Sequence, residues 1–286
     1  MLLPRYFKFI GWVLLPAGII LSVLVQFAEY VIPWLNYGGR TQSIKPFANQ
    51  MSNLTDETGA TAMVLGAILI GFSRLKNENN LTHQLRLHSL YWSVIVVCTI
   101  TAGCMCLLAI VSAMPESIKQ LLPDSVFFFL FELNFATLLF VFVIRFYYVL
   151  SNKTNSVKLN LLPYKPYNII AKTGILLFAI FISVAIIFDI PYSSFSDNFI
   201  ALLPFVVLLI ASKEKEEPND STRLTAMTFG VFINAVLVLT FTWVLYGLQY
   251  WDALVYLMVS LQTVFFIIYY AMRFFRSKAP IQTTLA

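Results

Sequence analysis

Four polar side chains lie inside long apolar segments of this sequence, and they are the first candidates for chemistry. Glu132 and Asn134 stand close together in a strongly aromatic apolar run. Asn234 and Gln262 lie in two later apolar runs. A carboxyl group in such a setting holds an ion or a proton, or it forms a hydrogen bond that locks its helix to a neighbour. The three amides form hydrogen bonds between helices or line a polar path, and the residue types leave both interpretations open.

The densest group of charges is the stretch 212–224, which reads SKEKEEPNDSTRL. A looser stretch at 73–87, SRLKNENNLTHQLRL, also ends in Arg-Leu before a long apolar segment. Charged stretches of this kind are typical of solvated turns, and here Pro218 stops helical extension while Asp220 or Ser221 can cap the next helix. The alternative is a docking site for a cytoplasmic protein partner. Its candidate residues are Lys213, Glu214, Lys215, Glu216, Glu217 and Arg223.

Patterns for metal binding and catalysis are missing from the sequence. His83 and His88 are the two histidines, and no cluster of Cys or carboxylates accompanies them, so we expect no metal site. Cys98, Cys104 and Cys106 lie in one apolar run, where a thiolate is poorly solvated and a cysteine packs as a small side chain. No phosphate-binding glycine loop, zinc-protease helix or Ser/His/Asp set is present. We therefore expect no cofactor, no catalytic residue and no enzymatic activity.

The elements that must position these residues are apolar runs of membrane length. Of the 286 residues 59% are hydrophobic and 12% are charged, about half the charged fraction of a soluble domain. Runs of about 20 apolar residues span a bilayer as helices. The sequence predicts eight of them, at 9–28, 54–72, 89–113, 126–150, 168–188, 198–211, 224–247 and 253–275. We expect an all-α integral membrane protein without a soluble domain.

The distribution of basic residues predicts how these helices are oriented. If both termini lie in the cytoplasm, Arg40, Lys45 and Lys119 fall outside, and the other sixteen of the 19 basic residues fall inside. An excess of Lys and Arg in cytoplasmic loops is the general rule for membrane proteins. The net charge of +5 is therefore explained by topology and by anionic lipid headgroups. We expect the lipid bilayer, and not nucleic acid, as the partner of these basic residues.

The two halves of the chain match each other in residue type and spacing. The matched sets are Leu3-Pro4 with Leu162-Pro163, Gly11 with Gly174, Ser73-Arg74 with Ser212-Lys213, and Arg86-Leu87 with Arg223-Leu224. In addition, Asn134 lies 11 residues before Arg145, and Gln262 lies 11 residues before Arg273. Four helices per copy give both copies the same orientation, with any symmetry axis along the membrane normal. The sequence therefore predicts two tandem four-helix repeats, 1–153 and 154–286.

With these motifs the chain resembles a group of uncharacterised multi-pass inner-membrane proteins of bacteria. The shared features are an acidic-basic run that ends in Arg-Leu, here 213–224, followed by an aromatic residue and an Asn, here Phe229 and Asn234. A further feature is Asn-x10-Arg-Phe, here 134–146. The first half departs from the pattern, because its loop is rich in Asn and Val97 stands where the second half has the Asn. The resemblance covers most of the chain and implies a bacterial inner membrane, but it implies no activity.

Two functions remain open from the sequence. The preferred one is a membrane-embedded scaffold, sensor or regulatory subunit that presents its cytoplasmic loops to a partner. The alternative is a small transporter or channel whose path lies between the two repeats. It is supported by the equivalent helices 54–72 and 198–211, which are short or broken by glycines and by Pro204, as in duplicated transporters. Because coupled transporters usually hold ions with carboxylates and this chain has few in its apolar runs, we prefer the first. The sequence indicates no oligomeric state.

Overall fold

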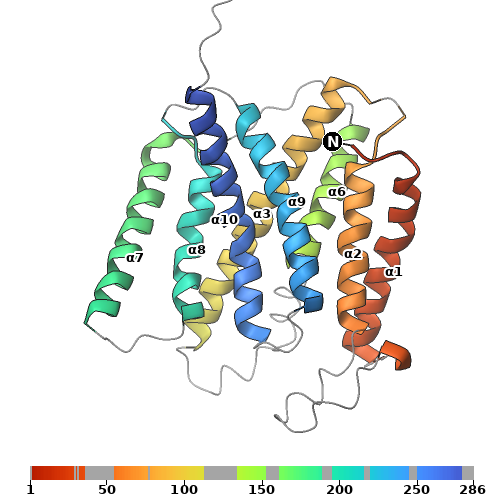
Figure 1. Cartoon of the computed structure of the whole chain (residues 1–286), viewed down its shortest axis with the longest axis horizontal. Coiled ribbons are helices and arrows are strands. Elements are labelled where there is room, and N and C mark those ends of the chain that lie inside the picture. The colour runs from red at the N-terminus through yellow and green to blue at the C-terminus, as the bar shows by residue number, and fades with distance from the viewer. Residues whose placement is uncertain are drawn as a thin grey trace, which may run out of the picture.

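The long apolar runs of the sequence form helices that stand side by side (Figure 1). The computed structural model describes residues 2–28, 30, 32–35, 55–76, 78–112, 134–152, 161–188, 195–215, 220–244 and 250–278. Its helices are α1 (Phe7–Ala28), α2 (Thr55–Phe72), α3 (Asn80–Ser112), α6 (Asn134–Ser151), α7 (Ile169–Ile187), α8 (Phe195–Ala211), α9 (Asp220–Val244) and α10 (Tyr250–Lys278). A 3-10 turn, Pro33–Leu35, follows α1, and a π-helical turn, Tyr164–Asn168, precedes α7. The described part of the chain is all-helical, as predicted.

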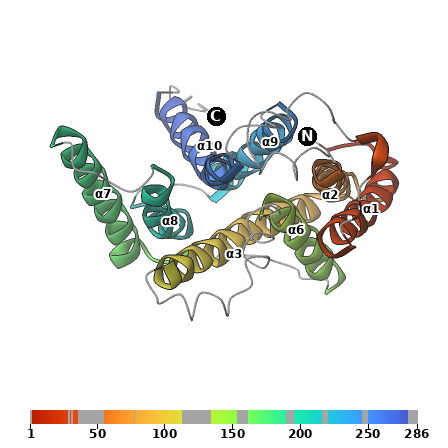
Figure 2. The same ribbon diagram turned by 90° about the horizontal axis from the view of Figure 1, so that it is seen from below.

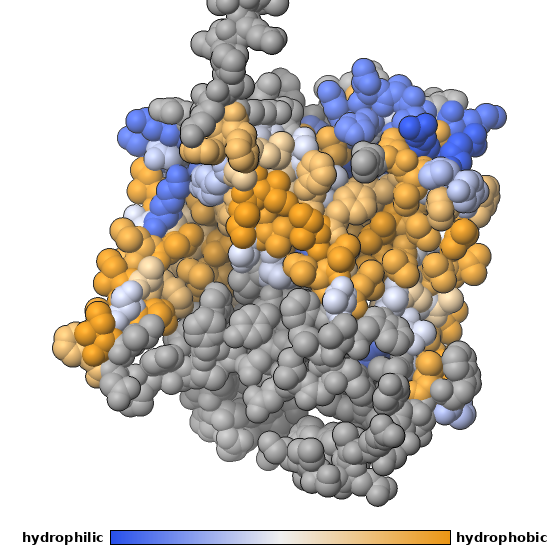
Figure 3. Space-filling view, in the orientation of Figure 1, coloured by the Kyte–Doolittle hydropathy of each residue, from blue (hydrophilic) through white to orange (hydrophobic). Residues whose placement is uncertain are grey.

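Four helices within the described ranges are long and apolar enough to cross a membrane. Their apolar spans are Phe7–Val25, Asn80–Cys104, Tyr164–Val184 and Thr222–Thr240. Shorter apolar helical stretches are Glu57–Phe72, Phe135–Ser151, Leu202–Ala211 and Ser260–Phe275. Figure 3 shows apolar residues across the middle of one face and hydrophilic residues along its upper edge. A face with this much exposed apolar surface suits contact with lipid rather than with water.

The helices alternate in direction, so that the N-terminus and the end of α10 lie at the same side of the bundle (Figure 1). Viewed along the bundle, α1 and α2 form one end, α7 and α8 form the other, and the remaining helices lie between them (Figure 2). The long helix α3 packs against α6, α8 and α9, and so contacts helices from both halves of the chain. The centre of the fold is therefore shared between the two halves.

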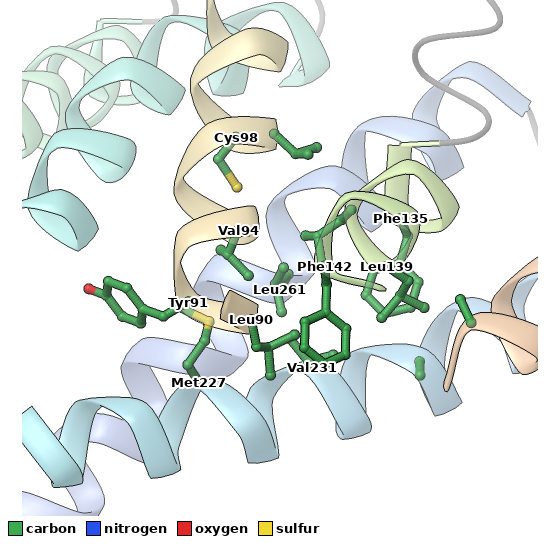
Figure 4. Packing of buried hydrophobic residues seen from close by; sticks show 14 of the residues in the cluster. Leu90, Tyr91, Val94, Cys98, Phe135, Leu139, Phe142, Met227, Val231 and Leu261 are labelled. Atoms are coloured by element: carbon green, nitrogen blue, oxygen red, sulfur yellow. The ribbon is translucent and has the colours of Figure 1, made fainter. Parts of the chain in front are cut away.

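The core forms where α3, α6, α9 and α10 meet (Figure 4). Leu90 and Val94 of α3, Phe142 of α6, Val231 of α9 and Leu261 of α10 are buried in one cluster. Leu, Val and Phe carry no polar atoms, so this contact needs only close packing. The polar residues described below lie around this apolar centre.

Helices α1 and α2 form a close pair that depends on glycine. Gly11 and Gly18 on α1 face Gly59 and Gly66 on α2. A Cβ atom on Gly66 would lie 2.5 Å from the backbone nitrogen of Leu15, and one on Gly18 would lie 2.8 Å from the carbonyl oxygen of Gly59. Small residues let membrane helices approach until their backbones touch. These glycines therefore serve packing.

Helices α2 and α8 are short but continuous, which differs from the prediction that glycines or Pro204 break them. Helix α2 runs for 18 residues and α8 for 17, and Pro204 lies inside α8 without ending it. The glycines of α2 are explained by its contact with α1. The support for a transport path in the sequence was a pair of short or broken helices, and the described helices are short but not broken.

Helices α2 and α8 end in the same backbone arrangement. At the end of α2, the N–H of Leu3 donates to the carbonyl of the last helical residue, and the N–H of Arg74 donates back to Leu3, both at 2.9 Å. At the end of α8, Leu162 and Lys213 make the same two bonds, again at 2.9 Å. These are the two isolated parallel β-bridges of the described structure. The bridging positions are among those that match between the two halves of the sequence.

Helices α3 and α9 begin earlier than predicted, inside the two charged stretches. Helix α3 begins at Asn80, where the preceding Asn79 accepts hydrogen bonds at 2.7 Å from the backbone N–H and the hydroxyl of Thr82. This is the geometry of an N-terminal cap. Helix α9 begins at Asp220. As a result Arg86 and Arg223, predicted to close solvated loops, lie on helices and are buried.

Candidate functional site

Arg223 is the centre of a buried polar cluster at the side of the bundle where the chain begins. Its side chain is 2% exposed. The two N–H groups of Nη1 share three acceptors, the Tyr91 hydroxyl at 2.9 Å and the carbonyls of Ile210 at 2.8 Å and Ser212 at 3.0 Å. The Tyr91 hydroxyl donates to the Ile210 carbonyl, and the Tyr269 ring centroid lies 5.4 Å from the guanidinium carbon. Because Tyr91 belongs to α3, this cluster joins the two halves of the chain.

Arg86 occupies a matching position after α2. It is 1% exposed, and its guanidinium forms hydrogen bonds with both carboxylate oxygens of Glu78, at 2.8 and 3.2 Å. It also donates to the carbonyl of Ser73 at 3.2 Å, as Arg223 does to the serine that follows α8. The Phe146 ring centroid lies 5.0 Å from its guanidinium carbon. Each buried arginine therefore holds one turn to the bundle through a backbone carbonyl and an aromatic ring.

Glu214 is buried in the turn after α8 and is bound by basic residues of two other helices. It forms ion pairs with Arg273 of α10 and with Lys172 of α7, whose Nζ lies 3.5 Å from Oε1. The Tyr270 hydroxyl donates to the same carboxylate at 2.9 Å. A buried carboxylate is stable when it is paired and hydrogen-bonded in this way. Glu214 therefore ties α7, α8 and α10 together.

The residues predicted for docking separate into two groups. Lys213 and Lys215 are exposed on the turn after α8. Glu214 and Arg223 are buried and already bound within the chain, so they are not presented to a partner. Their burial follows from helix contacts that the local sequence pattern does not contain. Two further candidates, Glu216 and Glu217, lie outside the described residues.

The predicted intramembrane amides Asn234 and Gln262 are buried in the bundle. Asn234 accepts a hydrogen bond from the Ser260 hydroxyl, and Gln262 donates to the Cys98 sulfur at 3.2 Å. The other amide atoms, Nδ2 of Asn234 and Oε1 of Gln262, have no hydrogen-bond partner in the described structure. The contact between Gln262 and Cys98 joins α10 to α3. Both amides therefore link helices and retain unused hydrogen-bonding capacity, and Gln262 does so at a contact between the two halves.

Of the other two intramembrane candidates, Glu132 and Asn134, the structure describes only the backbone of Asn134. Glu132 lies outside the described residues. Asn134 is the first residue of α6, and its side chain lies outside the described part as well.

Two contacts between helices, one buried and one partly exposed, were missed from the sequence. The hydrogen bond between Arg223 and Tyr91 joins residues 132 positions apart, and no periodic pattern points to it. Arg145 of α6 lies over the Trp92 ring of α3, with its guanidinium carbon 3.8 Å from the ring centroid. A cation placed over an indole face is stabilised by the ring electrons. In the described ranges, no three His, Cys, Asp or Glu side chains gather in a way that suits a metal ion.

The comparisons with known proteins give no relative for this fold and these clusters. No family model, curated protein or solved structure matches the chain. The resemblance to bacterial inner-membrane proteins therefore stays a prediction that rests on the motifs alone. Function has to be argued from the chain's own residues.

Proposed function

We propose that the chain is a multi-pass protein of the bacterial inner membrane with eight spans. The spans form two tandem four-helix repeats, 1–153 and 154–286, with both termini in the cytoplasm. Three observations support this arrangement: the identical backbone bridges after α2 and α8, the buried arginines that bind both turns, and the common side of the N-terminus and the end of α10. The bias of basic residues toward that same side supports the cytoplasmic assignment.

A reporter fusion tests this topology. A phosphatase that is active only outside the cytoplasm, inserted in the segment 115–122, is expected to be active, because this segment joins two spans on the external side. The same reporter fused after Lys278 is expected to be inactive, and a cytoplasmic fluorescent protein at that position is expected to be bright. The reverse pattern at either position would exclude the eight-span arrangement.

The function that the geometry supports best is a non-enzymatic scaffold, sensor or regulatory subunit. The observation that carries it is the ordered charged turn after α8. Arg223 holds this turn through the Ser212 carbonyl, and Glu214 holds it through α7 and α10, while Lys213 and Lys215 remain exposed. A surface that is ordered before binding loses little conformational entropy when a partner binds. The two lysines form a basic contact for an acidic surface of a cytoplasmic protein.

A transporter or channel with its path between the repeats is the second candidate. The unpaired atoms of Asn234 and Gln262 favour it, because a polar solute at the contact between the halves would pair with them. In that function the hydrogen bond between Arg223 and Tyr91 closes the path at its cytoplasmic end. The same amides, as simple links between helices, are equally compatible with the scaffold.

Complementation of a deletion strain separates the two functions. The scaffold predicts that Lys213→Glu with Lys215→Glu abolishes complementation, because the basic contact is reversed, whereas Asn234→Leu with Gln262→Leu retains it. Transport predicts the opposite result. The readout is the growth or transcript profile that distinguishes the deletion strain, with folded protein measured in every strain. Replacing both lysines by arginine is the matched control, and it should complement fully if charge is what the partner recognises.

A further inference from the structure

A cavity of about 580 Å³ opens beside the start of α1, at the side of the bundle where the chain begins. Its polar lining consists of four basic side chains, Arg5, Lys8, Arg74 and Lys76. They come from the start of α1 and from the turn after α2. Figure 3 shows hydrophilic residues at this upper edge of the molecule, directly above the apolar surface. The cavity is within the size range of pockets that bind small ligands.

The four cations of this cavity have no carboxylate partner in the described structure. None of them forms an ion pair among the described residues. Lys8 instead lies 4.9 Å from the ring centroid of Tyr147. The nearby acid of the same turn, Glu78, is bound to Arg86 and to the backbone N–H of Leu75. Four like charges around one cavity repel each other, so an anion that enters it is stabilised.

The matching turn in the second half differs from this one by a buried carboxylate. Leu75 and Glu214 each lie three residues after the end of their helix, α2 or α8, in turns with the same backbone bridge. Glu214 is buried and binds Lys172 and Arg273. In the first half the apolar Leu75 takes that position and lines the cavity. The carboxylate that satisfies basic residues in one half is thus replaced by a leucine in the other.

The rest of the cavity wall is apolar and largely exposed. Phe9 and Trp12 of α1 line it and are 74% and 48% exposed, and the end of α6 contributes Leu150. The apolar span of α1 begins at Phe7, so these side chains lie just below the membrane surface. Tryptophan is typical of this interface. A ligand that fits both parts of the wall has an anionic head and an apolar tail.

We propose that this cavity binds the headgroup of an anionic phospholipid, with its phosphate among the four cations and an acyl chain along Phe9 and Trp12. Basic pockets between membrane helices on the cytoplasmic side bind such headgroups. Four cations favour a lipid with two phosphates, of the cardiolipin type, over phosphatidylglycerol with one. A free phosphate ion would use the cations but leave the apolar wall uncovered. The site does not depend on whether the protein is a scaffold or a transporter.

Native mass spectrometry of the full-length purified protein tests the site. Wild-type protein is expected to retain cardiolipin more than phosphatidylglycerol, and to retain phosphatidylcholine least. Arg74→Ala with Lys76→Ala is expected to weaken cardiolipin retention about thirtyfold, because each basic residue strengthens binding to an anionic headgroup about fivefold. Lys213→Ala with Lys215→Ala removes the same number of exposed charges from the matching turn and is expected to leave cardiolipin retention unchanged. An equal loss in both pairs would show general surface attraction and overturn the site.

The substitution Leu75→Glu tests the same site without removing a cation. It places a carboxylate where the second half has Glu214, and it is expected to weaken cardiolipin retention because one carboxylate lowers the summed charge of the cavity lining from +4 to +3. The unfolding temperature in lipid-free detergent should stay near that of the wild type, which separates loss of binding from loss of fold. Full retention of cardiolipin in this variant contradicts the proposal. Displacement of the lipid by millimolar inorganic phosphate would instead assign the cavity to a free anion.

Discussion

Arg223→Met is expected to destabilise the folded protein by about 3–5 kcal/mol, because it leaves buried acceptors without their donor. Methionine fills a similar volume, so the loss reports hydrogen bonding and not a cavity. The Tyr91 hydroxyl and the Ser212 carbonyl both lose the guanidinium, and the Ile210 carbonyl keeps only the tyrosine. The measurement is the midpoint of thermal unfolding in detergent, together with the yield of monodisperse protein.

Two companion variants make this expectation specific. Tyr91→Phe removes one partner of the cluster and is expected to cost about 1–2 kcal/mol, and the double variant with Arg223→Met should lose less than the sum of both. Lys213→Met changes an exposed cation on the turn after α8, ten positions before Arg223, and should have no measurable effect on the unfolding temperature. If Arg223→Met unfolds at the wild-type temperature, the arginine does not hold the two halves together.

The positions of the helices follow from the sequence because an apolar segment in lipid must satisfy its backbone hydrogen bonds internally. Helix α7 was predicted at 168–188 and is observed as Ile169–Ile187. An apolar run of this length satisfies all of its backbone groups only as a helix, whatever packs against it. The start of α3 was missed by nine residues for the opposite reason. Arg86 made the segment look solvated, and its burial depends on Glu78 and the Ser73 carbonyl, which the fold brings to it.

The match between the two halves of the sequence identified positions in the candidate site, but it did not predict which of them are buried. Arg86 and Arg223 were singled out because they occur at matching places, but the pattern carries no information about burial. Their buried state depends on partners such as Tyr91, which lies on a helix of the other half. The contrast between Leu75 and Glu214 was present in the sequence, yet it has meaning only once both turns are known to have the same backbone bridge. The local sequence pattern therefore identifies these residues, whereas their burial and their hydrogen-bond partners depend on tertiary contacts.

Gly66→Leu is expected to separate α1 from α2 and to remove most of the folded protein. A Cβ atom at this position would lie 2.5 Å from the backbone nitrogen of Leu15 and 2.9 Å from its Cα. Backbone atoms of a helix cannot move aside as the end of a side chain can, so the two helices must shift apart. Overpacking costs about 1–3 kcal/mol when side chains can adjust, and a clash with backbone should exceed that range.

Gly103→Leu is the matched control, because a Cβ atom on Gly103 of α3 meets nothing within 4 Å. It should unfold near the wild-type temperature, whereas Gly66→Leu should unfold well below it, with Gly66→Ala in between. The basic cavity makes a second readout available, since Arg5 and Lys8 come from α1 while Arg74 and Lys76 follow α2. Any Gly66→Leu protein that survives purification should therefore retain less cardiolipin. Equal stability of the two leucine variants would mean that α1 and α2 do not approach through their glycines.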